Sequence, residues 1–288
     1  MKIYIVGISG MLGSKLFENF LSLKNVKVRG SSRKLPQKYL NLKNKIDLNV
    51  DVNNLNLISK IINKFKPNVV INCVGVVKQK IKSKNEENKV FYLNSVFPHE
   101  LYKITSLNKS RLIHFSTDCV FNGKKGNYKE TDKVNAKDLY GISKIYGELH
   151  LPNSLTLRTS IIGHEINEKK GLLEWFLSKK KTCDGYDKSF FSGFPTDEIF
   201  RILKKIIKEK KLCGVYHLSS SRISKYKLLK TIAKIYKKKI SIKINNKYKI
   251  DRSLNSKKLK NIIDYKSPSW EKLIKKMHKN NGNNKLFC

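Results

Sequence analysis

The sequence predicts an α/β fold built on a parallel β-sheet, with a smaller lobe near the C-terminus. Over the first 160 residues, short apolar runs alternate with segments whose apolar residues recur at helical spacing. A glycine-rich segment, residues 7–13, stands between the first apolar run and the first helical segment. Because strands that alternate with helices at this spacing pair in parallel through right-handed βαβ units, we expect one sheet with helices packed on it.

The first strand is expected at Lys2–Val6, an apolar and β-branched run that ends at Gly7. The first helix is expected at Met11–Leu23, whose apolar residues lie largely on one face. Further strands are expected at 26–28, 69–73, 111–116 and 155–162, and further helices at 58–65, 90–107 and 140–150. The run at 69–73 is continuously apolar, which is typical of a strand buried on both faces of a parallel sheet. These elements predict a first domain over residues 1–163.

The pattern changes beyond residue 163. Helices are expected at 172–180, 196–208, 225–236 and 270–277, and a strand at 214–218. We expect a helix and strand near 196–218 to return to the sheet, and residues 164–288 to form mainly a smaller lobe that ends in a frayed tail from residue 279. A ligand is expected in the cleft between the lobes.

The charge is strongly positive, with 61 basic and 22 acidic residues and a formal net charge of +39. A nucleic-acid binder is one interpretation of such a charge. However, only seven of the basic residues are arginine, the side chain best suited to bidentate recognition, and the lysines are spread over nearly every expected helix. This spread favours a compositional bias, and we expect no specific nucleic-acid partner, only weak binding to polyanions at low salt.

The cysteines and the apolar runs limit the remaining classes. The five cysteines stand far apart and form no C-x-x-C pair, so we expect free thiols and no metal site. No apolar run approaches the ~18 residues that cross a bilayer, and the N-terminus lacks the long apolar stretch of a secretory signal. The expected location is therefore the cytoplasm, with no membrane partner.

The glycine-rich segment carries the first functional signal. Gly7, Gly10 and Gly13 surround Met11 and Leu12 between the first strand and the first helix. Glycines at this position let the chain turn tightly and let backbone N–H groups approach a pyrophosphate at the positive end of the helix. The spacing differs from G-x-G-x-x-G, and an ordinary turn is the alternative, but the position predicts a nucleotide site.

The second signal follows the second strand, where the sequence has arginine instead of an acidic residue. Dinucleotide folds that prefer NAD usually place a carboxylate here for the ribose 2′-hydroxyl, whereas an arginine accommodates the 2′-phosphate of NADP. No Asp or Glu lies between Glu18 and Asp47, and Arg33 follows two serines. Arg33 therefore favours NADPH, with NADH as the alternative and a plain surface cation as the other interpretation of the residue.

Two further groups of residues carry candidate chemistry. Tyr140 and Lys144 stand four residues apart, on one face of an expected helix, where a nearby ammonium would lower the pKa of the phenol. Thr117 and Asp118 follow the strand at 111–116, at the edge of a parallel sheet where ligands bind. A hydroxyl at Thr117 could hydrogen-bond a carbonyl oxygen that gains negative charge, although a turn residue is the alternative.

In this order the motifs resemble the extended short-chain dehydrogenase/reductase superfamily and, more narrowly, the dTDP-4-dehydrorhamnose reductase family. The resemblance rests on the glycine segment, on Ser116-Thr117-Asp118-Cys119-Val120-Phe121-Asn122-Gly123, and on Tyr140-Gly141-Ile142-Ser143-Lys144. It continues through Gly147-Glu148, Leu157-Arg158-Thr159 and the segment that begins at Arg252. Related dehydratases carry Asp-Glu after the hydroxyl residue, whereas here Cys119 follows Asp118, which disfavours dehydration.

The resemblance implies a Rossmann-like, doubly wound domain with a small substrate lobe, which reduces the 4-keto group of a nucleotide-linked deoxysugar. It implies that Tyr140 donates the proton, that Lys144 tunes Tyr140 and binds the nicotinamide ribose, and that Thr117 orients the carbonyl. The implied cofactor residues are Gly7, Gly10, Met11, Leu12, Gly13, Arg33, Asp51, Val52, Gly75, Val76, Tyr140 and Lys144, and the implied substrate residues are Thr117, Asp118 and Arg252. The alternatives are a sister enzyme, an epimerase or a reductase of another sugar nucleotide such as a UDP-sugar, and a non-catalytic NADP-binding subunit. A homodimer is a candidate assembly.

Overall fold

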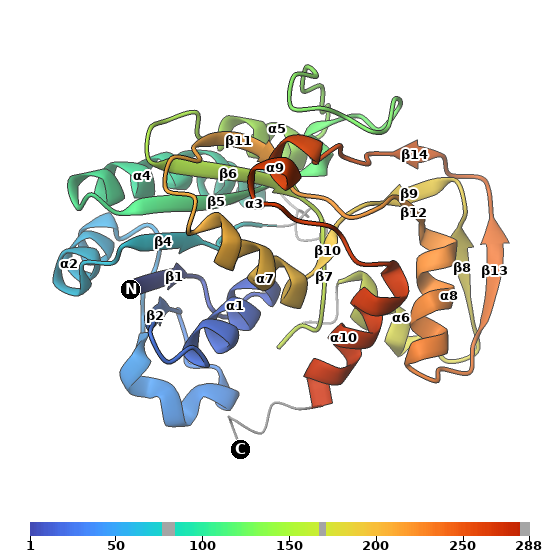
Figure 1. The fold of residues 1–288 in the computed structure, drawn as a ribbon, viewed down its shortest axis with the longest axis horizontal. Helices are drawn as coiled ribbons and strands as arrows, with labels where there is room; N and C mark the ends of the chain where they lie inside the picture. The colour runs from blue at the N-terminus through green and yellow to red at the C-terminus, as the bar shows by residue number, and fades with distance from the viewer. Residues whose placement is uncertain (77–83, 167–170, 283–288) are drawn as a thin grey trace.

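A computed structural model describes residues 1–76, 84–166 and 171–282, and it shows an α/β protein around a seven-stranded parallel sheet (Figure 1). The strand order is β11-β6-β5-β4-β1-β2-β3. The sheet consists of β1 (Lys2–Val6), β2 (Lys27–Ser31), β3 (Ile46–Asp47), β4 (Val69–Asn72), β5 (Arg111–Thr117), β6 (Ser154–Thr159) and β11 (Gly214–His217). The order reverses between β1 and β4, so the loops after these two strands diverge and open the edge where ligands bind in such sheets.

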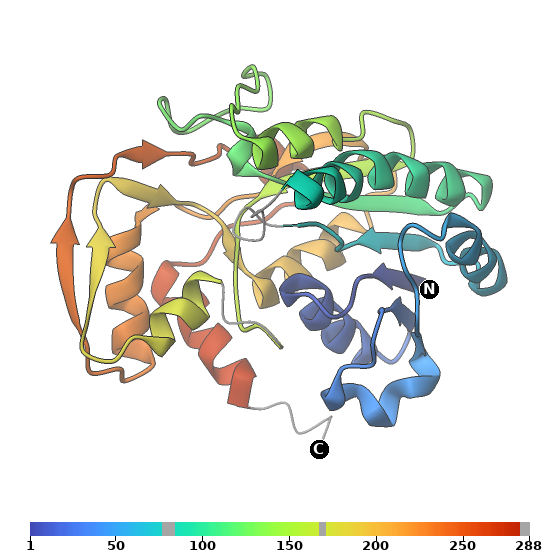
Figure 2. The same ribbon diagram turned by 180° about the vertical axis from the view of Figure 1, so that it is seen from behind.

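Helices cover both faces of the sheet. The first face carries α1 (Met11–Leu21) and α7 (Thr196–Ile206), and the second carries α2 (Leu55–Phe65), α3 (Lys84–Phe91), α4 (Phe97–Leu107) and α5 (Leu139–Tyr146) (Figures 1 and 2). All seven residues of β5 are buried, as expected of a central parallel strand with apolar layers on both sides. The predicted fold class is confirmed.

Among the described residues, three short helical segments complete this part of the chain. They are the 3-10 helices η1 (Gln37–Lys45) and η4 (Asp118–Val120) and the π-helical turn η3 (Tyr92–Val96), which links α3 to α4. The sequence predicted one helix over 90–107 and gave no sign of the π-turn. Single π-turns inside helices are often found at functional sites.

The second half of the chain forms a lobe beyond the carboxyl ends of the sheet strands (Figure 1). Its strands pair as β7 (Ile161–Ile162) with β10 (Phe194–Pro195), as β8 (Thr182–Tyr186) with β13 (Ser241–Asn245), and as β9 (Ser189–Phe191) with both β12 (Ile223–Ser224) and β14 (Ile250–Asp251). Its helices are α6 (Leu172–Ser178), α8 (Lys225–Ile235), α9 (Lys257–Ile262) and α10 (Trp270–Gly282). Between 164 and 288 the chain also contributes α7 and β11, and β11 pairs with β6 at one edge of the main sheet. A domain boundary near residue 163 stays a prediction.

Two sequence expectations are wrong in detail. The strand expected at 155–162 is broken at Ser160, because the carbonyl of Ser160 accepts a hydrogen bond from Phe194 N (2.9 Å) and the chain changes partner from the main sheet to β10. The tail expected from residue 279 instead continues α10 as far as Gly282, and residues 283–288 lie outside the described part of the chain. Within the described residues, no helix combines the length and the apolarity needed to span a bilayer.

Candidate functional site

The glycine turn between β1 and α1 is shaped by close backbone contacts. Gly7 has φ +88°, and a Cβ on Gly13 would lie 2.1 Å from the carbonyl oxygen of Gly7. Only glycine at position 13 therefore lets α1 start directly against the end of β1. Gly10 differs, because the nearest atom to a Cβ there would be 3.8 Å away. The side of the turn at Gly10 is open, which leaves room for a ligand to approach the backbone.

The start of α1 fits an anion. Gly10 occupies the cap position, where it has no side chain to bond the first N–H groups of the helix, and the first turn holds no acidic residue. These N–H groups, which include those of Met11 and Leu12, lie at the positive end of the helix. The open space at Gly10 and this donor set suit a pyrophosphate, as the sequence predicted.

The end of β2 presents a cation. The carbonyl of Ser31 accepts hydrogen bonds from Gly7 N (3.2 Å) and Ile8 N (3.0 Å), so the end of β2 is held against the glycine turn. Arg33 follows two residues later and is exposed. Asp47, an acidic residue on the neighbouring strand, is engaged by Arg29, whose Nη2 lies 2.5 Å from Asp47 Oδ1. This edge therefore offers a guanidinium, which suits a 2′-phosphate better than a free ribose hydroxyl.

Asp51 and Val52 lie beside this edge. Val50 N donates to the carbonyl of Ser32 (3.3 Å), which holds the segment near the end of β2. Asp51 is exposed, and its Oδ1 accepts hydrogen bonds from the backbone and side-chain nitrogens of Asn53 at 2.9 and 2.6 Å. Asp51 is thus accessible at this edge and Val52 is half-buried, and their role in binding the cofactor stays a prediction.

Gly75 and Val76 follow β4 and meet the helix that carries Lys144. Asn94, in the π-turn η3, accepts from Val76 N (3.0 Å) and donates to the carbonyl of Val76 (3.1 Å) and to Ser143 Oγ (3.1 Å). A Cβ on Gly75 would lie 3.4 Å from Lys144 Nζ. Asn94 therefore joins the loop after β4 to α5 through hydrogen bonds. In this arrangement the Lys144 ammonium lies beside Gly75.

Thr117 and Tyr140 meet at the end of β5. Asp138 caps α5 by accepting from Gly141 N (3.0 Å), and a Cβ on Gly141 would lie 2.5 Å from the carbonyl oxygen of Cys119. Glycine at 141 thus lets the first turn of α5 press against the chain that follows Thr117. The side chains of Thr117 and Tyr140 become neighbours as a result. The Thr117 hydroxyl itself donates to Asp118 Oδ1 (3.3 Å) and accepts from Cys119 N (3.1 Å).

The ionisation of this pair differs from the sequence prediction. Burial raises the pKa of Tyr140, as does the nearby Cys119, while the Thr117 side chain lowers it by less. The prediction that Lys144 lowers the pKa of Tyr140 is wrong, because burial dominates the shift and Lys144 Nζ donates instead to the carbonyl of Phe115 (2.8 Å). Burial also lowers the pKa of Lys144 to about 8. Tyr140 is therefore a neutral phenol at neutral pH, the form that can give up a proton.

The predicted substrate residues lie next to this pair. Asp118 is buried and accepts from Thr117 Oγ1 (3.3 Å). Arg252 reaches the same place from the far lobe, where its Nε donates to the carbonyl of Phe121 (2.7 Å) and its Nη1 lies 3.8 Å from Cys119 Sγ. The structure therefore brings Asp118 and Arg252 to the end of β5, although part of the Arg252 guanidinium is already used by the backbone.

A buried ion pair supports the end of β5. Glu148 accepts from Arg158 Nε and Nη2, each at 2.7 Å, and from Ser116 Oγ at 2.8 Å. Arg158 Nη1 also contacts His217 Nε2 at 3.3 Å, and His217 Nδ1 lies 3.0 Å from the carbonyl of Tyr128, to which it must donate. Since both charges are buried and paired, Ser116 and its neighbour Thr117 are fixed relative to the end of α5.

Asn94 was not predicted as a site residue. Ser143, Glu148 and Arg158, by contrast, lie within the motifs on which the family resemblance rests. The only signal for Asn94 is a polar residue at a buried position of an expected helix. Its contacts depend on the loop after β4, which is 18 residues away in the chain. Such a contact has no periodic signature.

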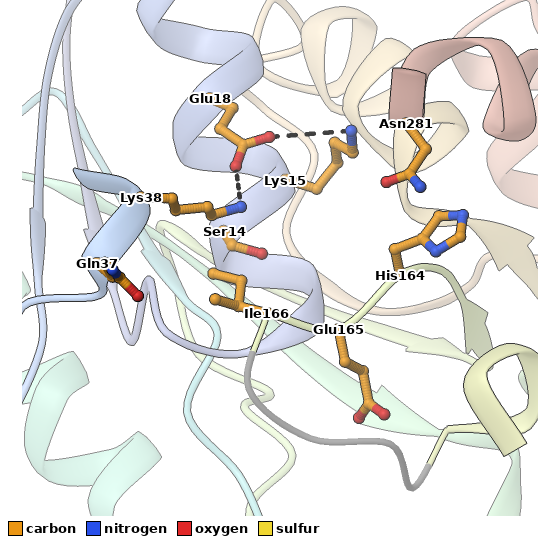
Figure 3. A pocket seen from close by; sticks show the side chains of 9 residues that line it. All are labelled: Ser14, Lys15, Glu18, Gln37, Lys38, His164, Glu165, Ile166 and Asn281. Atoms are coloured by element: carbon orange, nitrogen blue, oxygen red, sulfur yellow. Dashed lines mark hydrogen bonds and ion pairs between the residues drawn. The ribbon is translucent and has the colours of Figure 1, made fainter. Parts of the chain in front are cut away.

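A separate pocket of about 500 Å³ lies beside α1, on the side of η1 (Figure 3). It is lined by Ser14, Lys15, Glu18, Gln37, Lys38, His164, Glu165, Ile166 and Asn281. Its two lysines form ion pairs with Glu18, and Lys15 also pairs with Asp197 (3.7 Å). None of the predicted catalytic residues lines this pocket, so it is not the site at the end of β5.

Together, the strand order, the glycine turn between β1 and α1 and the lobe beyond the sheet define a Rossmann-like protein of the extended short-chain dehydrogenase/reductase class. More narrowly, the chain belongs to the family described as RmlD substrate binding domain, whose model matches residues 1–282.

Individual relatives agree with this family. A dTDP-4-dehydrorhamnose reductase from Aggregatibacter actinomycetemcomitans is 32% identical over 183 residues, 59% of this chain and 61% of that protein. Methionine adenosyltransferase 2 subunit beta from Danio rerio is 27% identical over 188 residues, 60% of this chain and 57% of that protein. The alignments therefore span less than two thirds of either relative. The solved dTDP-4-dehydrorhamnose reductase from Bacillus anthracis, in complex with NADP, shares the fold with a TM-score of 0.80 at 19% identity, covering 97% of this chain and 99% of that one.

Proposed function

We propose that this protein is an NADPH-dependent reductase of the 4-keto group of a nucleotide-linked deoxysugar. The observation that carries the proposal is that the side chains of Thr117 and Tyr140 are neighbours at the end of β5. A neutral phenol and a hydroxyl side by side can both hydrogen-bond one carbonyl oxygen. Reductases bearing the name dTDP-4-dehydrorhamnose reductase stand among the relatives of this chain and support the substrate class.

The cofactor would lie across the reversal of strand order, with its pyrophosphate at the start of α1 and its 2′-phosphate at Arg33. Lys144 and Gly75 would hold the nicotinamide ribose, because the ammonium lies beside the glycine where no side chain blocks approach. A bound NADPH would supply the hydride that the chain itself cannot. NADH is the alternative cofactor, and Arg33 is the residue that disfavours it.

The chain itself handles the proton. Thr117 would turn its hydroxyl proton from Asp118 to the ketone oxygen and orient it, and Tyr140 gives its proton to that oxygen as it becomes an alkoxide. Lys144 carries a positive charge below a pH of about 8, and its ammonium would serve the nicotinamide ribose. The Glu148–Arg158 ion pair, which fixes the end of β5 relative to the end of α5, would hold Thr117 and Tyr140 in their relative positions.

The experiment that tests the proposal follows the absorbance of NADPH with candidate dTDP- and UDP-linked 4-keto sugars. We expect oxidation of NADPH that depends on the keto sugar. Failure of every such sugar to consume NADPH would refute the proposal.

A non-catalytic NADP-binding subunit is one alternative, and proteins that are subunits by name, methionine adenosyltransferase 2 subunit beta, also match this chain. Such a subunit would bind NADPH without consuming it, so the same assay separates the two. An epimerase is the other alternative, and it would interconvert sugars with no net loss of NADPH.

A cytoplasmic location, a homodimer and the lack of specific nucleic-acid or membrane partners stay predictions. Mass measurement of the intact assembly in solution tests the homodimer.

A further inference from the structure

A second cation joins Arg252 beside the Thr117–Tyr140 pair. Lys225 is the first residue of α8 and follows Ser224, which pairs with Phe190 of β9, while Arg252 follows Asp251, which pairs with Phe190 on the other side of β9. The register thus starts both cations from one place in the lobe, and the charge of Lys225 interacts with Asp118, Cys119 and Arg252. We name Lys225, Arg252 and Asp118 the basic cluster. Its members come from three distant segments, η4, the start of α8 and the chain after β14, so it exists only because the lobe folds onto the sheet (Figure 1).

The place of Lys225 is fixed by its neighbours. Ser224 caps α8 by accepting from Lys227 N (3.2 Å) and donates to Asp187 Oδ1 (2.6 Å). β12, which ends at Ser224, is paired with β9. The start of α8 is therefore held rigidly, and the stem of Lys225 begins from a defined point.

A positive charge on Lys225 is unfavourable in the folded chain when no anion is bound. The residue is half-buried, and burial lowers its pKa, while Asp118 and Cys119 raise it by less. Within the residues that the structure describes, the Lys225 ammonium has neither a hydrogen bond nor an ion pair. A partly desolvated cation without a partner gains most from an incoming anion.

The charges of the basic cluster do not balance. Two cations, Lys225 and Arg252, face one carboxylate, that of Asp118, and Thr117 already donates a hydrogen bond to this carboxylate. The cluster therefore keeps an excess positive charge beside Asp118 and Cys119, at the end of β5. An anionic group attached to the reacting sugar would complete it.

We propose that Lys225 binds the diphosphate of the substrate and is the residue that makes the enzyme specific for nucleotide-linked sugars. The inference rests on the function proposed above. The anion is the diphosphate of the substrate and not that of the cofactor, because the cofactor's pyrophosphate has its own donors at the start of α1. Arg252 assists, but its Nε remains on the carbonyl of Phe121.

The test compares Lys225→Met with Lys227→Met, a matched control from the same turn of α8 whose side chain is exposed. For Lys225→Met we expect KM for the nucleotide sugar and Kd for the free nucleoside diphosphate to rise about ten- to a hundredfold, as for loss of a charge-assisted hydrogen bond. The Kd for NADPH should stay unchanged. Lys225→Arg should restore most of the affinity, and Lys227→Met should behave as wild type.

The outcomes separate this inference from the proposed function. If the wild type turns over keto sugars and Lys225→Met leaves KM and the nucleoside diphosphate Kd unchanged, the role of Lys225 is refuted while the reductase stands. If no keto sugar reacts but the nucleoside diphosphate binds and Lys225→Met abolishes that binding, the anion site stands and the reductase fails. A variant that only lowers Tm, with normal affinities, assigns Lys225 to folding and overturns the inference.

Discussion

Tyr140 lies half-buried beside Thr117, with a pKa raised above its ordinary value chiefly by desolvation, and therefore carries its proton at neutral pH. In Tyr140→Phe the ring still packs, but the proton donor is lost. We expect turnover to fall by about 10²–10⁴-fold, as for removal of a general acid, with the Kd for NADPH nearly unchanged. Steady-state kinetics and cofactor titration check this. Retention of more than about a tenth of wild-type turnover would show that Tyr140 is not the acid.

Arg33 is exposed at the end of β2, and the neighbouring carboxylate of Asp47 is engaged by Arg29. A guanidinium can form paired hydrogen bonds with a 2′-phosphate. We expect Arg33→Ala to weaken NADPH binding about tenfold or more while changing NADH binding little. Titration of both cofactors against both proteins measures the ratio, and a ratio unaffected by the substitution would remove Arg33 from the site.

The lowered pKa of Lys144 predicts how the stability of the protein depends on pH. Its pKa of about 8 in the folded chain lies below the ~10.4 of an unperturbed lysine, so between these values the unfolded chain binds more protons. Wild-type stability therefore gains from Lys144 as the pH rises through this window, whereas below about 8 the buried charge costs stability. The free energy of unfolding of Lys144→Met, relative to wild type, should fall between pH ~8 and ~10.4. Urea unfolding without cofactor measures it, and a constant difference across the window would contradict the burial of a charged Lys144.

Gly10 and Gly13, in the turn between β1 and α1, allow two substitutions to be compared within one element. A Cβ at Gly13 would lie 2.1 Å from a backbone oxygen, whereas a Cβ at Gly10 would meet its nearest atom at 3.8 Å. We expect Gly13→Ala to lose about 1–3 kcal/mol of stability, as for overpacking. Gly10→Ala should fold with stability close to wild type but bind NADPH much more weakly, because its methyl group enters the space left for the pyrophosphate. Unfolding curves and cofactor titrations distinguish the two, and normal NADPH binding by Gly10→Ala would place the cofactor elsewhere.

The elements that could be predicted are those whose signal is local. The strands β1, β4 and β5 are buried on both faces, so their apolar runs mark them directly. The lobe strands β7, β10, β12 and β14 have two residues each, too few for any periodicity. The break at Ser160 depends on the chain near Phe194, which approaches it only in the folded protein.

In the candidate site, too, only the residues with a local sequence signal could be predicted. Thr117, Tyr140 and Lys144 could be named because each occupies a recognisable place after a strand or on a helix turn. Asn94 and Lys225 could not, since their importance comes from segments far along the chain. The direction of the Tyr140 pKa shift was also missed, because the burial that raises this pKa arises only in the folded chain. The carbonyl of Phe115, to which Lys144 donates instead, belongs to a strand and carries no side-chain signal.

At the scale of the whole molecule, the net charge of +39 gives a prediction about partners. Counterion release makes any protein this basic bind DNA at low salt, so the informative affinity is that at physiological salt. There we expect only millimolar to micromolar binding, indifferent to sequence, competed by heparin and without effect on NADPH turnover. Nanomolar, sequence-selective binding, in the range of specific DNA-binding proteins, would contradict the enzyme account and favour a nucleic-acid function.

The most direct test of the central claim follows the hydride itself. The wild-type protein is mixed with NADPH that carries deuterium at the transferred position, together with the nucleotide-linked 4-keto sugar, and the sugar is analysed by mass spectrometry. The account predicts one deuterium on the carbon that bore the ketone, in amounts equal to the NADPH consumed. A product without deuterium, or a sugar recovered unchanged while NADPH stays bound, would contradict it.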